Sequence, residues 1–285
     1  MFASFASFLL AVSVGLSSGA PDPQARATAA GYEQLRGFAT VLVTHLNRAL
    51  GTEHLPPFVG APVTPGLIVT ADPSRVQLFD RFAVPLSAGR VSPPEPSPEC
   101  ASKCPKILFD TFRRWWFELG VESRTHAVEV PDVVLIGAHR DLPAQTLTQI
   151  AYAASESRPI QPPRLMLLTH GGPAGVRGIP FYLVRPGGLT LPPNSAALGL
   201  TVTIEPGRFV VTAAARSFGR TLSATSVPEL VAILKDVHRH HPNKAAIVYR
   251  FSGDVSVGNF VATYAAVREE FPVAVLGDDE PITIP

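Results

Sequence analysis

An internal repeat is the sequence feature that most constrains the fold of this chain. Residues 66–76 (GLIVTADPSRV) and 199–209 (GLTVTIEPGRF) are identical at six of eleven positions, and Asp72 in the first stretch corresponds to Glu205 in the second. Each stretch predicts a strand, a turn around a proline and a second strand, because β-branched residues flank a turn-forming Pro-Ser or Pro-Gly pair. Repeated units fold alike, so the fold has to accommodate this pattern twice.

Both copies continue in the same order after the hairpin. The helical and strand periodicities of the first copy predict a helix, a strand, a helix and a strand over Ile107–Leu119 (closed by Gly120), Val133–Ile136, Pro143–Glu156 and Leu165–Leu168. The second copy predicts the same series over Val227–His241, Ala246–Tyr249, Ser256–Glu270 and Val273–Leu276. The predicted fold class is α+β, with two tandem β-β-α-β-α-β units, each a small mixed sheet with two helices on one face.

The repeat divides the chain into five parts. These are a leader over residues 1–20, a helical segment and Pro-rich linker over 21–65, a first domain over 66–170, a Gly/Pro-rich connector over 171–198 and a second domain over 199–285. Within the second part, residues 32–47 predict an amphipathic helix. One apolar face is expected to hold Phe38, Leu42, Val43 and Leu46.

The leader indicates export. Residues 5–16 form an apolar run of signal-peptide length, and Ser18-Gly19-Ala20 has the small-x-small pattern of a cleavage site. No Lys or Arg precedes the apolar run, and Pro21 directly follows the expected cleavage point. A cleaved signal peptide, an uncleaved membrane anchor and an apolar cytoplasmic N-terminus are therefore all kept open, with the exported forms favoured.

Composition excludes several classes of protein. With 46% hydrophobic and 16% charged residues, the chain is able to bury a sizeable core, which excludes wholesale disorder. A formal net charge of +1 provides no electrostatic footprint for nucleic acid. Two cysteines are too few for a disulfide-dense scaffold. Cys100 and Cys104 are predicted to form one short-range disulfide, the alternative being a redox or metal-binding pair.

The second strand–helix segment of each copy carries a resemblance to a known family. VVLIGAHRDLPAQTLTQIAYAA (133–154) and AAIVYRFSGDVSVGNFVATYAA (245–266) resemble the periplasmic domain of the ExbD/TolR biopolymer-transport family, present here as two tandem copies over 66–170 and 199–277. The resemblance implies a non-enzymatic envelope protein of biopolymer transport or envelope maintenance. Its partner would be a peptide segment of a TonB/TolA-like protein, or peptidoglycan, and an exposed sheet edge would accept the peptide as an added strand.

This chain departs from the family at two points. The family places an acidic residue directly after the strand, where His139 and Ser252 stand here, and residues 1–20 contain no Asp or Glu for proton coupling. The two polar turns are nevertheless the predicted binding residues: His139, Arg140, Asp141, Ser252, Gly253 and Asp254. Each turn precedes a helix N-terminus that favours an anion or carboxylate, unless Asp141 or Asp254 caps the helix itself.

Two rival functions remain at this stage. The first is a metal-dependent hydrolase that uses the region of His238 and His241, within the run HRHH; cationic residues at a helix C-terminus are the simpler interpretation of that run. The second is a purely structural envelope protein. No catalytic residue, metal ligand or cofactor is predicted, no nucleic-acid partner is expected, and both homodimerisation and anchoring through residues 1–20 are left open.

Overall fold

The structure is a computed structural model that describes residues 38–79, 81–92, 94–100, 103–127, 129–158, 161–184, 199–213 and 221–277. The predicted leader over residues 1–20 lies outside these ranges, and so do residues 185–198 of the predicted connector. No helix within the ranges combines the length and the apolar character that crossing a membrane needs.

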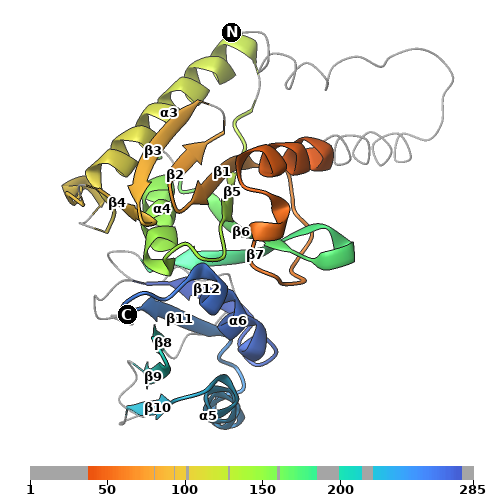
Figure 1. Ribbon diagram of the computed structural model, residues 1–285, viewed down its shortest axis with the longest axis vertical. Helices are drawn as coiled ribbons and strands as arrows, with labels where there is room; N and C mark the ends of the chain where they lie inside the picture. The colour runs from red at the N-terminus through yellow and green to blue at the C-terminus, as the bar shows by residue number, and fades with distance from the viewer. Residues whose placement is uncertain are drawn as a thin grey trace, which may run out of the picture.

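The described chain is a mixed α/β structure built on one twelve-stranded sheet, in the order β10-β9-β8-β11-β12-β7-β6-β5-β1-β2-β3-β4 (Figure 1). The strands before the connector are β1 Leu67–Asp72, β2 Arg75–Leu78, β3 Phe82–Ser87, β4 Arg90–Val91, β5 Val133–Ala138, β6 Arg164–His170 and β7 Val176–Leu183. Those after it are β8 Leu200–Glu205, β9 Arg208–Ala213, β10 Leu222–Ala224, β11 Ala246–Phe251 and β12 Val273–Leu276. We call β1 to β6 the first half and β8 to β12 the second half.

Strand pairing follows the same series in both halves. In the first half, β1 pairs antiparallel with β2 and parallel with β5, and β5 pairs parallel with β6. In the second half, β8 pairs antiparallel with β9 and parallel with β11, and β11 pairs parallel with β12. The sequence prediction was wrong on two points, because each half has a third antiparallel strand, β3 or β10, and the halves share one continuous sheet.

Strand β7 makes the sheet continuous, although it lies in the predicted connector over 171–198. It pairs antiparallel with β6 on one side and parallel with β12 on the other. Alternate residues Ile179, Phe181 and Leu183 are buried, which is the pattern of a strand. Pro180 is tolerated here because pairing with β12 begins only at Phe181, so the missing N–H lies outside that ladder.

Four helices pack on one face of the sheet and contribute to the same core: α3 Lys106–His126, α4 Ala144–Glu156, α5 Val227–His240 and α6 Val257–Val267. The helix predicted to stop at Gly120 continues past it, because an isolated glycine only weakens a helix. The end comes at Ala127, which has left-handed backbone angles, φ 52° and ψ 41°.

The other face of the first half is covered by a helix over residues 38–49. Leu42 and Leu46 pack there against Leu135 and Leu168. A Cβ on Gly137 would lie 2.8 Å from Leu46 Cδ2, so the absence of a side chain at Gly137 lets the helix approach the sheet. Val43 was expected on the buried face but is exposed, so the apolar stripe is narrower than the sequence indicated.

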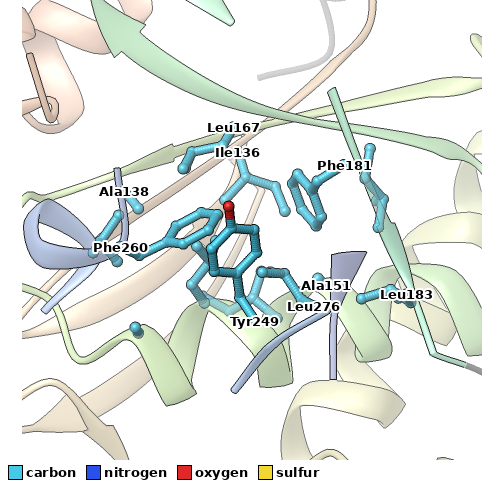
Figure 2. Packing of buried hydrophobic residues seen from close by; sticks show 14 of the residues in the cluster. Ile136, Ala138, Ala151, Leu167, Phe181, Leu183, Tyr249, Phe260 and Leu276 are labelled. Carbon is cyan, nitrogen blue, oxygen red and sulfur yellow. The ribbon is translucent and has the colours of Figure 1, made fainter. Parts of the chain in front are cut away.

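The two halves meet in a shared core. Tyr249 of β11 is fully buried, with its ring edge-on to Phe260 of α6 at a centroid distance of 5.1 Å. Figure 2 shows its hydroxyl group directed toward Ile136 and Leu167, which belong to the first half. No described residue forms a hydrogen bond with this hydroxyl, and burial raises its pKa well above the usual value. The halves therefore pack as one body.

Candidate functional site at the junction of the two halves

The structure brings the two sequence-predicted turns to one place. The backbone of Leu142–Ala144, which follows the first turn, pairs with Val255–Val257, which follows the second, through an antiparallel bridge between Pro143 and Ser256. Ala144 donates its N–H to the Val255 carbonyl at 2.8 Å, and Val257 donates to the Leu142 carbonyl at 2.8 Å. All six predicted residues therefore flank one junction, although 113 positions separate His139 from Ser252.

This pairing occupies the helix N-terminus that was predicted to attract an anion. In α6, Val257 N–H donates to Leu142, and Gly258 N–H donates to the Arg140 carbonyl at 2.7 Å. The Ser256 side chain accepts a hydrogen bond from the Asn259 N–H, and the Asn259 side chain accepts one from the Ser256 N–H. The two bonds together form a capping box. The amides of the first turn of α6 thus bond to the first-half turn segment and to the Ser256 side chain.

Neither aspartate acts as a helix cap, contrary to the simpler interpretation of the turns. The N-cap of α4 is Pro143 and the N-cap of α6 is Ser256. The Asp254 carboxylate instead forms an ion pair at 2.5 Å with Arg90 of β4, so it links the two halves across the surface. Its side chain is 89% exposed, and such a pair contributes little to stability.

The first turn differs from the second because it carries a histidine pair. The ring of His139 stacks on that of His54, from the short 3₁₀-helix η1 Thr52–His54, with centroids 4.9 Å apart. Nδ1 of His139 accepts a hydrogen bond from the Asp141 N–H at 3.1 Å and lies 3.6 Å from the Asp141 carboxylate. Burial lowers the pKa of His139, and Asp141 partly opposes this effect.

The predicted Pro-rich linker fixes this region to both halves. Phe58 donates its N–H to the His170 carbonyl at 3.0 Å in the first half. On the second half, its ring lies edge-on to Tyr264 at 5.6 Å, and the Arg268 guanidinium lies 4.8 Å from its centroid. The linker is therefore part of the junction and closes one side of it.

The histidines of the rival metal site lie at the end of α5, on another part of the molecule. His238 packs edge-on against Phe271 at 5.5 Å, and His240 Nδ1 lies 2.8 Å from the Asp236 carbonyl oxygen. His241 forms the C-cap of α5. Within the described ranges, no group of three His, Cys, Asp or Glu residues is arranged to hold a metal ion.

The two cysteines are joined in a disulfide, with Cα atoms 5.9 Å apart. Cys100 ends the short 3₁₀-helix η2 Pro98–Cys100, and both cysteines are buried in the main core. The bridge closes a loop of few residues, so its entropic contribution lies at the low end of the usual range. It fixes the entry to α3 and does not reach the junction.

The outer strands of the sheet are candidate binding elements whose strand character the sequence did not reveal. Hydrogen bonds to neighbouring strands establish which way their backbone groups face. The Ile204 carbonyl accepts from the Ser252 N–H, so the backbone groups of Ile204 point toward β11. Successive residues of a strand point their backbone groups to opposite sides, so those of Thr203 point toward β9. Val210 of β9 pairs with Thr203, and its backbone groups therefore point toward β8. Phe209 and Val211 then face β10, where they pair with Ala224 and Leu222.

Because Leu222 and Ala224 point their backbone groups toward β9, those of Ser223 between them point to the open side of β10. The Ser223 N–H and C=O face away from β9, and no described strand lies on that side of β10. Ser223 is exposed as well. A strand of three residues shows no alternation in sequence, so this edge was not recognisable before the structure.

The same reasoning describes the first-half edge. The Leu86 N–H donates to Ser74 at 2.7 Å, so Val84 faces β2, while Ala83 and Pro85 face outward. Pro85 has no N–H to offer, and β4 pairs with the end of β3 at Leu86 and Ser87. This edge therefore presents one outward N–H, that of Ala83, followed by the donor-free Pro85 and the end paired with β4.

Comparison of the chain with protein-family models, with curated proteins and with solved structures found no match.

Proposed function

We propose that this chain is a non-enzymatic binding protein of the cell envelope that takes up an extended peptide segment of a protein partner. The proposed mode is that of ExbD/TolR-like periplasmic domains, with a TonB/TolA-like partner in biopolymer transport or envelope maintenance. The turns at the junction are not the proposed binding surface, because the segments that follow them bond to each other and the Arg140 carbonyl accepts from the Gly258 N–H of α6.

The open edge of β10 carries this proposal. A peptide lying beside β10 would donate to the Ser223 C=O and accept from the Ser223 N–H, extending the sheet by one strand. Main-chain hydrogen bonds supply affinity in this mode, and pockets for alternate side chains supply specificity. On the α5 side, Val227 and Val231 are partly buried at the border of the core, where an apolar peptide side chain would pack.

The first-half edge is proposed to be closed to peptides. Pro85 interrupts its row of donors, which is a recognised way of preventing edge-to-edge pairing. The Arg114 guanidinium of α3 lies 5.1 Å from the ring centroid of Phe82, so a side chain also covers part of β3. A single peptide per chain is the expected stoichiometry.

The shared pairing series of the two halves supports a finer proposal on the fold. We interpret the first and second halves as two copies of one unit, each with three antiparallel strands followed by two strand–helix crossovers. The repeated GLxVT segments stand in equivalent strands, β1 and β8, and each pairs with the strand that precedes the second helix of its half. One copy would then have kept its edge for binding while the other closed it.

Export remains part of the proposal. The apolar run and small-residue motif of residues 1–20 support a cleaved signal peptide or a retained anchor. Sequencing the N-terminus of the protein purified from its native host decides between them. Intact Met1 on protein from the soluble cytoplasmic fraction would exclude the envelope altogether.

The binding proposal is tested with peptides selected from a display library of random ten-residue sequences, titrated by calorimetry into the full-length protein. Ser223→Pro removes the outward N–H and leaves the β9–β10 ladder intact, so we expect affinity to fall at least about tenfold. Ala83→Pro is the matched control, because it removes an outward N–H from the outer strand of the other half.

Equal loss in both variants, or none in either, would contradict the assignment to β10. Soluble muropeptides form the second arm of the test. Binding of muropeptides that is unaffected by Ser223→Pro, with no selectable peptide, would indicate a peptidoglycan-binding protein and overturn the peptide proposal. Circular dichroism and thermal melting of each variant establish that it is folded.

A further inference from the structure

Helix α3 exposes an apolar face that no part of the described chain covers. Of the five large hydrophobic side chains that are exposed in the described residues, three belong to α3: Phe117 is 68% exposed, and Ile107 and Val121 are each 40% exposed. Phe117 and Val121 are four residues apart, so they lie on one face of the helix. At 100° per residue, Ile107 also lies within the same quarter of the helix circumference. Figure 1 shows α3 on the outside of the first half.

The helix is also longer than its own packing requires. Its buried residues end at Leu119, yet α3 continues for seven more residues to His126. Helical turns without a buried face are marginal in water, because most helical stability in proteins comes from packing. These last turns carry Val121, part of the exposed apolar face.

Packing between the described elements does not account for Gly120. Beyond the helix's own backbone, the nearest described atom to a Cβ placed there is Arg124 Nη1, at 3.9 Å, so a side chain has room. A mid-helix glycine costs about 1 kcal/mol relative to alanine. Next to an exposed aromatic residue, a glycine allows a second helix to approach closely.

The charges along α3 favour a particular occupant. Residues 106–116 carry three basic and one acidic side chain, whereas residues 118–126 carry two acidic and one basic side chain, His126 aside. A second α3 that crosses antiparallel at Phe117 brings Arg113 and Arg114 of one copy near Glu118 and Glu122 of the other. Within one chain, Arg113 already pairs with Glu99 and Asp110, and Arg81 pairs with Glu118 and Glu122, so contacts between copies would extend or replace these pairs. A parallel crossing brings like charges together instead.

We propose that α3 is a self-association surface through which two copies of this chain pair antiparallel, with Phe117 at the crossing point. An isologous pair of this kind uses the same face of both copies. Phe117 supplies the apolar anchor, and the charges set the orientation more than the strength, since Arg114 already contacts Glu118 at 3.2 Å within one chain. A single helix pair is smaller than a standard interface, so the dimer is weak and concentration-dependent.

The test measures sedimentation equilibrium of the full-length protein over a range of concentrations. We expect reversible dimerisation, with Phe117→Asp raising the dissociation constant at least about tenfold. Val59→Asp is the control, because it places the same acid on another exposed apolar position, 59% exposed. A concentration-independent monomer, or equal behaviour of both variants, overturns the proposal.

Cysteine cross-linking tests the orientation. Both native cysteines form a disulfide, so an added cysteine is the one free thiol. In the antiparallel pair, the two copies of Phe117→Cys meet and cross-link, whereas the two copies of Thr125→Cys lie about 24 Å apart at 1.5 Å per residue. Equal cross-linking of both variants overturns the antiparallel arrangement. Association that Phe117→Asp leaves intact assigns dimerisation to another surface.

Discussion

The two halves of the molecule pair their strands in the same series but differ at equivalent positions. The fifth residue of β5 is Gly137, and Leu46 of the N-terminal helix packs against it. The fifth residue of β11 is Arg250, whose side chain would obstruct a helix in that position. At the outer strands, the first half presents Pro85, whereas the second presents Ser223.

The two halves of the proposed repeat differ at few positions, and these differences fall on the outer face and the outer strands. One half is closed on its outer face by a helix and at its edge by a proline, a short strand and an arginine. Among the described residues, the other half lacks that helix, and no strand pairs with the outward N–H and C=O of its outer strand. The first half is therefore expected to contribute mainly stability, and the second half to contribute binding.

The largest effect is expected from importing a second-half residue into the first half. Gly137→Arg forces a charged side chain against Leu46 in a site without space, where even a Cβ would lie at 2.8 Å. We expect a loss of about 3–5 kcal/mol in the free energy of unfolding, measured by urea denaturation. Gly120→Arg adds the same side chain to a glycine with open surroundings and should change stability by less than about 1 kcal/mol. Similar losses for both would contradict the role of Gly137.

A smaller effect distinguishes the two polar residues of the second turn. Ser256→Ala removes the capping box of α6 and is expected to cost about 0.5–2 kcal/mol of stability. Asp254→Ala breaks one exposed ion pair with Arg90 and should cost less than about 1 kcal/mol. Thermal denaturation of the two variants at one pH measures both changes. A larger loss of stability for Asp254→Ala than for Ser256→Ala would show that the ion pair with Arg90 stabilises the protein more than the α6 capping box does.

The smallest effect concerns pH and is confined to the first half, because Ser252 stands where His139 stands. Burial places the pKa of His139 in the folded protein below its ordinary 6.5, while the charges of Asp141 and Asp72 raise it and those of His54 and Arg140 lower it. The unfolded chain therefore binds this proton first, so stability falls as pH decreases from about 6.5. No contribution is expected well above that pH.

His139→Gln should make the decline in unfolding free energy between pH 7 and pH 5 shallower. The unsubstituted protein serves as the reference, and the two proteins should differ in this decline only below about pH 6.5. A steeper decline in His139→Gln would reverse the sign of the argument.

Much of the secondary structure was predictable because its signals are local. The continuous apolar run of β5 is typical of a buried parallel strand, and all six of its residues are buried. The closing strands β6 and β12 contain or equal the predicted ranges. β3, β7 and β10 escaped prediction because proline or brevity obscured their alternation, and neighbours far along the chain stabilise them.

The candidate site was predictable only in part. The polar turns were identified as a pair from the repeat, but nothing in the sequence indicates that Leu142–Ala144 bonds to Val255–Val257. Capping by Asp141 or Asp254 stayed an open alternative to binding, because the neighbouring Pro143 and Ser256 compete for the N-cap position and only backbone geometry decides between them. The histidine pair requires η1 to reach the first turn, a contact between segments more than eighty positions apart.

Amide hydrogen exchange, measured residue by residue with and without a selected ten-residue peptide, tests whether the peptide adds to the edge of β10. If the peptide pairs with β10, the Ser223 N–H, which has no partner strand among the described residues, exchanges rapidly in the free protein and becomes protected by peptide. The Ala83 N–H at the first-half edge should exchange at the same rate in both states. Peptide-induced protection at Ala83, or at the junction turns, with Ser223 unchanged would contradict the account.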